Sequence, residues 1–303
     1  MKKVLFFVLV CISITSCFQK KSENPEWIPF TWESGYEWGK YIEKMTIYIP
    51  VTIDNLPYNF TMQFDLGTSY SGFYVNSLKP FLEKYPSLKN KLDSTLHIYR
   101  KIDLKLGKVL FEDIDISQYK MGTEYSLDSI NSGSEIEIGT IGVDLIQNKV
   151  LIIDYNLNRL AITETLPAEY QNVIFEEFKI ENGLIKLPFR INGNSEYLMF
   201  DTGASYFRLA TTKQNALAIS GTEIIDSLKV TSWGKHIAFY GRETVVPIFF
   251  GDKIMEKTIV YYDEEASFDD IYQSINVWGL TGNGYFLNDL IIIDYKNNRF
   301  GVK

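Results

Sequence analysis

Short apolar runs rich in β-branched and aromatic residues recur along most of this 303-residue chain. In the first half they cover residues 45–53, 58–64, 102–106, 109–116 and 150–155. Such runs favour strands, because branched and aromatic side chains pack well on a pleated surface. Gly107-Lys108 separates two of the runs and predicts a hairpin turn. The pattern predicts a mostly β protein.

The second half repeats this layout, with strands predicted at residues 245–250 and 254–262 around a turn at 251–253. Short helices are predicted at residues 77–92 and 211–218. Two prolines, Pro80 and Pro86, fall inside the first helix, where proline removes a backbone hydrogen-bond donor.

The chain also carries an internal duplication. FDLGTS at residues 64–69 resembles FDTGAS at residues 200–205, an offset of 136. Further along, GTIGVDLIQNKVLIIDYNLNRLAI (139–162) matches GLTGNGYFLNDLIIIDYKNNRFGV (279–302) at 9 of 24 positions, an offset of 140. This period exceeds the roughly 20 to 50 residues of a solenoid repeat. It suits two similar lobes of ordinary domain size.

We therefore predict an N-terminal lobe at residues 45–165, an interlobe connection at 166–180 and a C-terminal lobe at 181–303. Residues 17–44 contain prolines and tryptophans and are predicted to be a tether that packs onto the first lobe. They carry no chemical motif.

Residues 1–16 have the layout of a signal peptide, with two lysines before an apolar run too short for a typical membrane helix. The run ends in Ile14-Thr15-Ser16-Cys17, which resembles the lipobox of bacterial lipoproteins. This resemblance implies cleavage before Cys17 and lipid modification of that residue. The chain would then be exported and anchored to a bacterial membrane, on the periplasmic or cell-surface side. An ordinary cleaved signal is the alternative.

The cysteine count and the net charge exclude several kinds of site and partner. Cys11 lies in the signal, so Cys17 is the only cysteine left, which excludes internal disulfides, thiolate zinc sites and cysteine nucleophiles. The formal net charge is −8, whereas nucleic-acid binding relies on cationic contacts to phosphates. We expect no nucleic-acid partner, no cofactor, no metal and a monomer.

Asp201-Thr202-Gly203-Ala204-Ser205 resembles the Asp-Thr/Ser-Gly-Ser/Thr/Ala motif of the aspartic peptidases. The motif at Asp65 fits except at its second position, where Leu66 stands. The apolar-Gly segments that this family places beside its catalytic loops are matched loosely by residues 140–142 and 280–282. The resemblance covers residues 45–303 and implies a bilobal pepsin-like fold, or equivalently two fused retropepsin-like lobes.

The resemblance further implies that Asp65 and Asp201 form a catalytic dyad for an aspartic-type endopeptidase with a peptide or protein substrate. Two adjacent carboxylates cannot both ionise readily, so one keeps a proton while the other deprotonates water. Residues expected to support the loops are Gly67, Thr68, Ser69, Thr202, Gly203 and Ser205.

Leu66 qualifies the prediction of activity, and a further prediction concerns a flap over the substrate. Family members brace the two loops with hydroxyl hydrogen bonds, and Leu66 has no hydroxyl, which puts activity in doubt. A flap is expected at Trp233-Gly234, because residues 231–236 contain a glycine turn and the corresponding stretch 93–101 has no glycine. Trp233, Gly234 and Tyr99 are predicted to contact substrate.

Other functions fit less well. A Ser-His-Asp hydrolase lacks a Gly-x-Ser-x-Gly motif, and the acidic run at 263–270 lacks EF-hand spacing. Asp154 and Asp294 precede polar turns and are interpreted as turn acceptors. A glycosidase requires carboxyl groups at least about 5 Å apart. The main alternative is a catalytically weak or inactive, lipid-anchored protein that binds peptide or glycan on the same fold.

Overall fold

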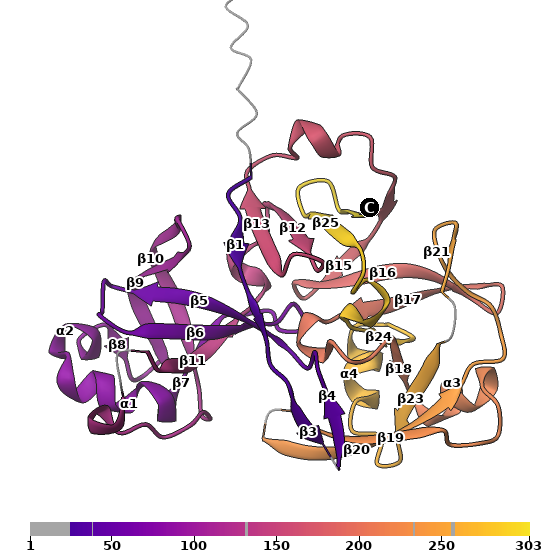
Figure 1. Ribbon diagram of the computed structural model, residues 1–303, viewed down its shortest axis with the longest axis horizontal. Helices are drawn as coiled ribbons and strands as arrows, with labels where there is room; N and C mark the ends of the chain where they lie inside the picture. The colour runs from indigo at the N-terminus through magenta and orange to yellow at the C-terminus, as the bar shows by residue number, and fades with distance from the viewer. Residues whose placement is uncertain (1–24, 38, 131–132, 233, 256–257) are drawn as a thin grey trace, which may run out of the picture.

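The computed structural model describes residues 25–37, 39–130, 133–232, 234–255 and 258–303. Over these residues strands dominate, and they form two lobes that lie side by side with a third sheet between and above them (Figure 1). The predicted mostly β, two-lobed fold is confirmed. Within the same residues, no helix is long and apolar enough to cross a membrane.

The N-terminal lobe is an eight-stranded sheet ordered β2-β5-β6-β11-β7-β10-β9-β8. An additional β5–β9 pairing curls the sheet on itself. The predicted turn at Gly107-Lys108 joins β9 to β10. The strands are β2 (Thr31–Trp32), β5 (Ile47–Ile53), β6 (Asn59–Phe64), β7 (Gly72–Tyr74), β8 (Leu92–Asp93), β9 (Ile98–Leu106), β10 (Val109–Tyr119) and β11 (Glu135–Ile141).

The helix predicted at residues 77–92 is two helices, α1 (Val75–Lys84) and α2 (Pro86–Lys89). Tyr85 between them is extended, because a residue that precedes proline is driven out of the helical region. The second predicted helix is confirmed as α3 (Lys213–Ile219), which Thr212 caps by accepting from the backbone N–H of Asn215. A fourth helix, α4 (Asp269–Ser274), lies within the acidic run.

The C-terminal lobe is a ten-stranded sheet ordered β19-β20-β23-β18-β24-β17-β16-β21-β22, with β15 paired to β16. The single strand predicted at residues 254–262 is wrong, since β22 ends at Ile254 and β23 begins at Ile259. The strands are β15 (Lys179–Glu181), β16 (Leu184–Ile191), β17 (Asn194–Phe200), β18 (Leu209–Thr211), β19 (Asp226–Ser232), β20 (Lys235–Glu243), β21 (Ile248–Phe250), β22 (Lys253–Ile254), β23 (Ile259–Asp263) and β24 (Gly279–Thr281).

A six-stranded sheet joins the lobes and unites the duplicated blocks. β12 (Val150–Asp154) pairs antiparallel with β25 (Leu290–Asp294), and Ile152 lies opposite Ile292. The outer strands are β1 (Ile28–Pro29), β13 (Arg159–Thr163), β14 (Phe175–Glu177) and β26 (Arg299–Val302).

The duplicated aspartates of this sheet act as turn acceptors, as predicted. Asp154 accepts from the N–H of Leu157, and Asp294 from the N–H of Asn297. Each also pairs with the arginine five residues later.

The N-terminal segment, described from residue 25, is built into the fold. β1 pairs with β13 of the joining sheet and β2 with β5 of the first lobe. The remaining strands, β3 (Gly35–Glu37) and β4 (Lys40–Ile42), form a separate hairpin. In Figure 1 this hairpin lies beside the C-terminal lobe, so the segment contacts both lobes and not the first alone.

Candidate active site

The two aspartates occupy equivalent positions at the ends of buried strands. Asp65 follows β6, which runs parallel to β11, and its N–H donates to the Ile141 carbonyl at 3.0 Å. Asp201 follows β17, which runs parallel to β24, and its N–H donates to the Thr281 carbonyl at 3.0 Å. The duplicated sequence therefore presents both carboxyl groups in the same way.

The loops that carry the aspartates face each other across the lobe boundary. A Cβ placed on Gly67 would lie 2.3 Å from Asp201 Cγ, and one on Gly203 would lie 2.7 Å from Asp65 Cγ. Real Cβ atoms do not approach other atoms this closely, so each loop needs glycine where the opposite carboxyl packs against its backbone. The structure thus brings Asp65, Asp201 and both predicted glycines together.

The two carboxyl groups accept different numbers of hydrogen bonds from backbone N–H groups. Asp65 Oδ1 accepts from the N–H of Gly67 at 2.8 Å. Asp201 Oδ1 accepts from the N–H of Gly203 at 2.8 Å and from that of Ala204 at 3.2 Å. Hydrogen bonds from N–H groups stabilise a carboxylate, so Asp201 is the better site for the negative charge.

Burial raises the pKa of Asp65 well above the usual value of a carboxyl group, and the charge and hydrogen bond of Asp201 raise it further. Burial also raises the pKa of Asp201, but the hydrogen bonds from Asp65, Gly203 and Ala204 oppose that rise. Both side chains keep some surface open to a cavity, although protein surrounds them. These causes raise the pKa of Asp65 more than that of Asp201, so they favour a proton on Asp65 and the charge on Asp201.

One hydroxyl braces the loops across the boundary. Thr202 Oγ1 accepts from the N–H of Leu66 at 2.9 Å and donates to the Phe64 carbonyl at 2.8 Å. Thr202 is fully buried, where unpaired backbone groups are costly. The predicted role of Thr202 thus agrees with its contacts.

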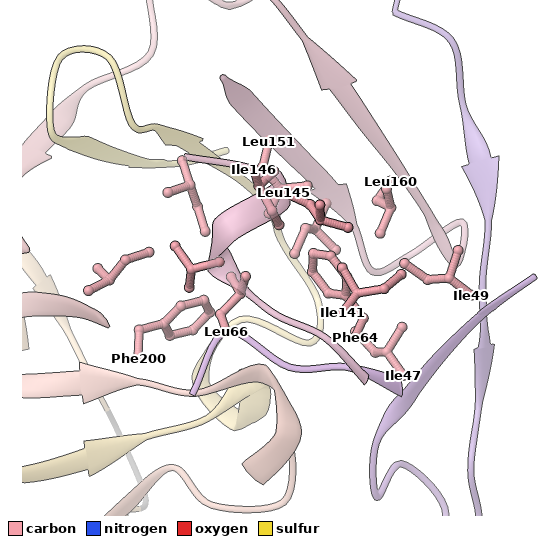
Figure 2. Packing of buried hydrophobic residues seen from close by; sticks show 14 of the residues in the cluster. Ile47, Ile49, Phe64, Leu66, Ile141, Leu145, Ile146, Leu151, Leu160 and Phe200 are labelled. Atoms are coloured by element: carbon pink, nitrogen blue, oxygen red, sulfur yellow. The ribbon is translucent and has the colours of Figure 1, made fainter. Parts of the chain in front are cut away.

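Leu66, at the equivalent position of the first loop, is an apolar core residue. Its side chain is fully buried and lies between Phe200 and the Leu145-Ile146 turn (Figure 2). At this position the first loop therefore has apolar packing in place of a second hydroxyl brace. This packing holds the loop without a directional hydrogen bond.

The predicted apolar-Gly segments do pass beside the loops. A Cβ on Gly282 would lie 1.9 Å from the Ala204 carbonyl oxygen, and one on Gly142 would lie 2.6 Å from the Tyr70 carbonyl carbon. Gly282 donates its N–H to the Phe207 carbonyl at 2.9 Å.

The remaining predicted support residues bond to backbone rather than to Asp65. Thr68 Oγ1 donates to the Tyr70 carbonyl at 3.4 Å, and Ser69 Oγ donates to the Asn182 carbonyl. Ser205 Oγ donates to the Thr202 carbonyl at 2.8 Å. These three hydroxyls therefore contact backbone carbonyl groups.

A cavity of about 410 Å³ opens above the dyad. The first lobe lines it with Gln63, Tyr74, Met121 and Thr140, and the C-terminal lobe lines it mainly with apolar side chains. Those of the C-terminal lobe include Met199, Phe207, Leu228, Val230, Phe239, Phe268, Ile271 and Leu280.

The hairpin β19–β20 borders this cavity, as the flap hypothesis expects. Gly234 lies at its tip with a φ of +78°, and it lines the cavity together with Thr231 and Ser232. Trp233 lies outside the described residues. Tyr99 does not face the cavity: it is fully buried against Phe73, at a centroid distance of 5.5 Å. Its predicted contact with substrate is wrong, because it points to the core face of β9.

Sequence reasoning missed one wall of the cavity. Glu33, Glu37 and Ile42 of the N-terminal segment line it together with the dyad, next to Met45 and Thr46 at the start of the first lobe. These residues carry no motif, and their strands are two or three residues long. The tryptophans were the sequence signal that the segment packs against folded protein.

Comparisons with known proteins add little to this geometry. No family model matches the chain, and no curated protein matches its sequence. Among solved structures, the chain is similar to the aspartic proteinase from Irpex lacteus, with a TM-score of 0.45 and 10% identity. The match covers 92% of this chain and 97% of that one.

Proposed function

We propose that this protein is an aspartic-type peptidase that hydrolyses peptide bonds with water activated between Asp65 and Asp201. The observation that carries this proposal is the mutual packing of the two loops, in which each carboxyl group lies against the glycine of the other loop. Two hydrogen-bonded carboxyl groups at the floor of a mainly apolar cavity supply a base and an acid at one point.

The unequal hydrogen bonding supports separate roles for the two aspartates. Asp201 carries the charge and accepts a proton from water as the water attacks the peptide carbonyl. Asp65 carries the shared proton and donates it toward the developing oxyanion. The protons titrate as a property of the pair. A glycosidase is disfavoured, because hydrogen-bonded carboxyl groups are closer than the roughly 5 Å that its mechanism requires.

The test is cleavage of a broad peptide library between about pH 3 and 7, with and without pepstatin. We expect Asp65→Asn to lower kcat/KM by about 10²- to 10⁴-fold, the usual contribution of acid–base catalysis. Asp128→Asn, an exposed aspartate of the same lobe, is the matched control and should cleave like the wild type. Equal cleavage by both variants would refute the proposal.

Leu66 favours a second candidate, a protein that binds peptide or glycan in the cavity without cleaving it. The first loop has no hydroxyl at Leu66, so only Thr202 supplies a hydroxyl brace at these two positions. A dyad that is held less rigidly loses catalysis before it loses binding. Saturable peptide binding without any cleavage across the library would favour this alternative.

We also propose that the chain is exported and held at a bacterial membrane by lipid on Cys17, which rests on residues 1–17 alone. Metabolic labelling with a fatty-acid analogue tests this. Wild type should take up the label and remain with membranes, and Cys17→Ser should do neither.

A further inference from the structure

The β3–β4 hairpin precedes the first lobe in sequence but is attached to the second. β3 lies against β19, the first strand of the flap hairpin. Ile42 of β4 is 4% exposed and packs in an apolar cluster of the C-terminal lobe that contains Phe207 and Leu228. Tyr36 and Tyr41, by contrast, are 74% and 54% exposed, so the hairpin is held along one side.

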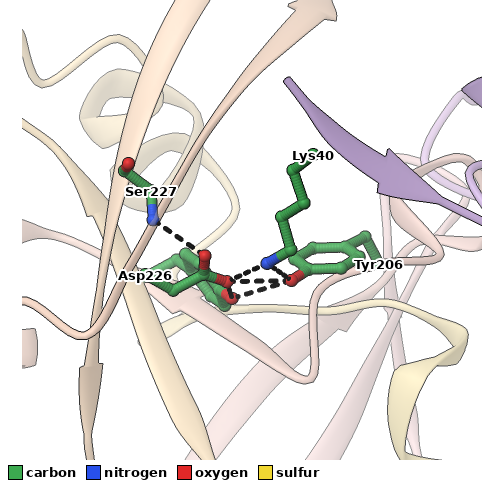
Figure 3. Close-up of polar contacts among 5 residues, drawn as sticks. Lys40, Tyr206, Asp226 and Ser227 are labelled. Atoms are coloured by element: carbon green, nitrogen blue, oxygen red, sulfur yellow. Dashed lines mark hydrogen bonds and ion pairs between the residues drawn. The ribbon is translucent and has the colours of Figure 1, made fainter. Parts of the chain in front are cut away.

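A single cation strengthens this attachment. Lys40 Nζ forms an ion pair with Asp226 Oδ2 and hydrogen-bonds the Tyr206 hydroxyl (Figure 3). Asp226 is the first residue of β19, and Tyr206 follows the Asp201 loop. One lysine therefore connects the N-terminal hairpin to the base of the flap and to the catalytic loop.

The C-terminal lobe builds this acceptor independently of Lys40. Asp226 Oδ2 accepts from the hydroxyls of Tyr206 at 2.9 Å and Tyr261 at 2.6 Å, and Asp226 Oδ1 accepts from the N–H of Ser227 at 2.9 Å. The Asp226 side chain is 15% exposed. Removal of the lysine thus leaves the carboxylate with hydrogen-bond partners, so the lobe keeps its fold.

The position of the hairpin bears on access to the dyad. Glu37 and Ile42 line the cavity that contains Asp65 and Asp201, and β19–β20 borders the same cavity. A volume of about 410 Å³ lies near the lower end of the roughly 300–1,000 Å³ of small-ligand pockets. The β3–β4 hairpin therefore forms part of the wall that a bound substrate would contact.

We propose that the β3–β4 hairpin is a cover of the cleft that acts together with the β19–β20 flap, and that Lys40 is the positioning residue that fastens it. Ile42 anchors the hairpin, and release of Lys40 from Asp226 lets the cover move aside. The cover role rests on the proposed peptidase function, whereas the fastening by Lys40 does not.

The fastening is tested by hydrogen exchange on the full chain. Lys40→Met should speed exchange of backbone amides in residues 35–42 and 226–232 by about threefold to tenfold, since a partly exposed charge-assisted contact is lost. Lys44→Met removes a charge from the same segment and should leave these amides unchanged. Equal exchange in wild type and Lys40→Met overturns the proposal.

The cover role is tested by kinetics on a short chromogenic peptide. Lys40→Met should raise KM by about threefold to tenfold, because a loosened hairpin no longer holds Glu37 and Ile42 against the bound peptide. The value of kcat should stay within about twofold, because Lys40 does not touch the dyad. Lys40→Arg should restore KM. Unchanged KM despite faster exchange overturns the cover role. Failure of the peptidase proposal is seen separately, as cleavage that persists in Asp65→Asn.

Discussion

Asp65 and Asp201 each bind a proton more tightly in the folded chain than in the unfolded chain, because burial raises the pKa of both. This tighter proton binding adds to the free energy of unfolding. Its contribution is fully present below the pKa of an unfolded aspartate, about 3.9, and is lost as the pH rises through the pKa of the folded state. Wild type should therefore lose stability relative to Asp65→Asn above about pH 4, by at most about 1.4 kcal/mol per pH unit for each proton.

Urea unfolding of both proteins at a series of pH values measures this difference. Asp201→Asn should behave like Asp65→Asn, because the two carboxyl groups titrate as a pair. Stability curves of wild type and variants that stay parallel from pH 4 to 7 would contradict the shared-proton assignment.

The brace at Thr202 gives a second prediction for a single residue. Thr202→Val keeps the shape of the side chain but leaves the N–H of Leu66 and the carbonyl of Phe64 without their partner. We expect a loss of about 1–3 kcal/mol in unfolding free energy, the penalty for unpaired buried groups. We also expect a lower kcat with little change in KM, since the dyad is disturbed and the cavity wall is not.

Thr61→Val is the control for this substitution. Thr61 lies on β6, four residues before Asp65, and is buried to a similar extent. It should keep activity, because its side chain does not cross the lobe boundary. Equal losses in the two variants would assign the effect to the loss of a buried hydroxyl in general rather than to the brace.

Some residues were predictable from the sequence and others were not. Asp65 and Asp201 stand in duplicated motifs, so one repeat identifies the other. Tyr99 was placed wrongly because alternation along a strand does not tell which face is the core. Asp226 carries no motif, since its role depends on tyrosines and a lysine brought together only by the fold.

At the scale of elements, the segment that ends in Gly282 must pass directly beside the Asp201 loop. Gly282→Ala would place a Cβ 1.9 Å from the carbonyl oxygen of Ala204, so backbone must shift. We expect a loss of about 1–3 kcal/mol, as for overpacking in a core, together with a large loss of peptide cleavage. Thermal unfolding and peptide cleavage measure the two effects.

Gly133→Ala is the matched control, because no atom lies within 4 Å of its added Cβ. It should unfold and cleave like the wild type. A fully active Gly282→Ala would show that the threading segment does not position the catalytic loop.

Elements with long periodic patterns were easier to predict than short ones. β5, β6 and β12 lie within two residues of their predicted bounds. The strands β1 to β4 were missed because each has only two or three residues. Strands β1 and β2 also pair with strands farther along the chain. Short-range patterns contain no information about such partners.

At the scale of the whole molecule, the candidate active site depends on how the two lobes are oriented. Neither lobe contains a complete dyad, and the brace from Thr202 joins one loop to the other. The six-stranded sheet sets this orientation, since its central strands β12 and β25 come from different lobes and pair over their full length. A substitution that destabilises this sheet should therefore lower peptide cleavage more than an equally destabilising substitution inside one lobe.

Ile152→Ala and Ile102→Ala distinguish destabilisation of the joining sheet from destabilisation inside one lobe. Both isoleucines are fully buried, Ile152 opposite Ile292 in the joining sheet and Ile102 within the first lobe. Each substitution should lower the unfolding free energy by about 2–5 kcal/mol. At a temperature where both variants are folded, only Ile152→Ala should lose activity per folded molecule, because only it loosens the pairing between the lobes. Denaturant unfolding gives the folded fraction and peptide cleavage gives the activity. Equal specific activity in the two variants would mean that the loops alone hold the aspartates together.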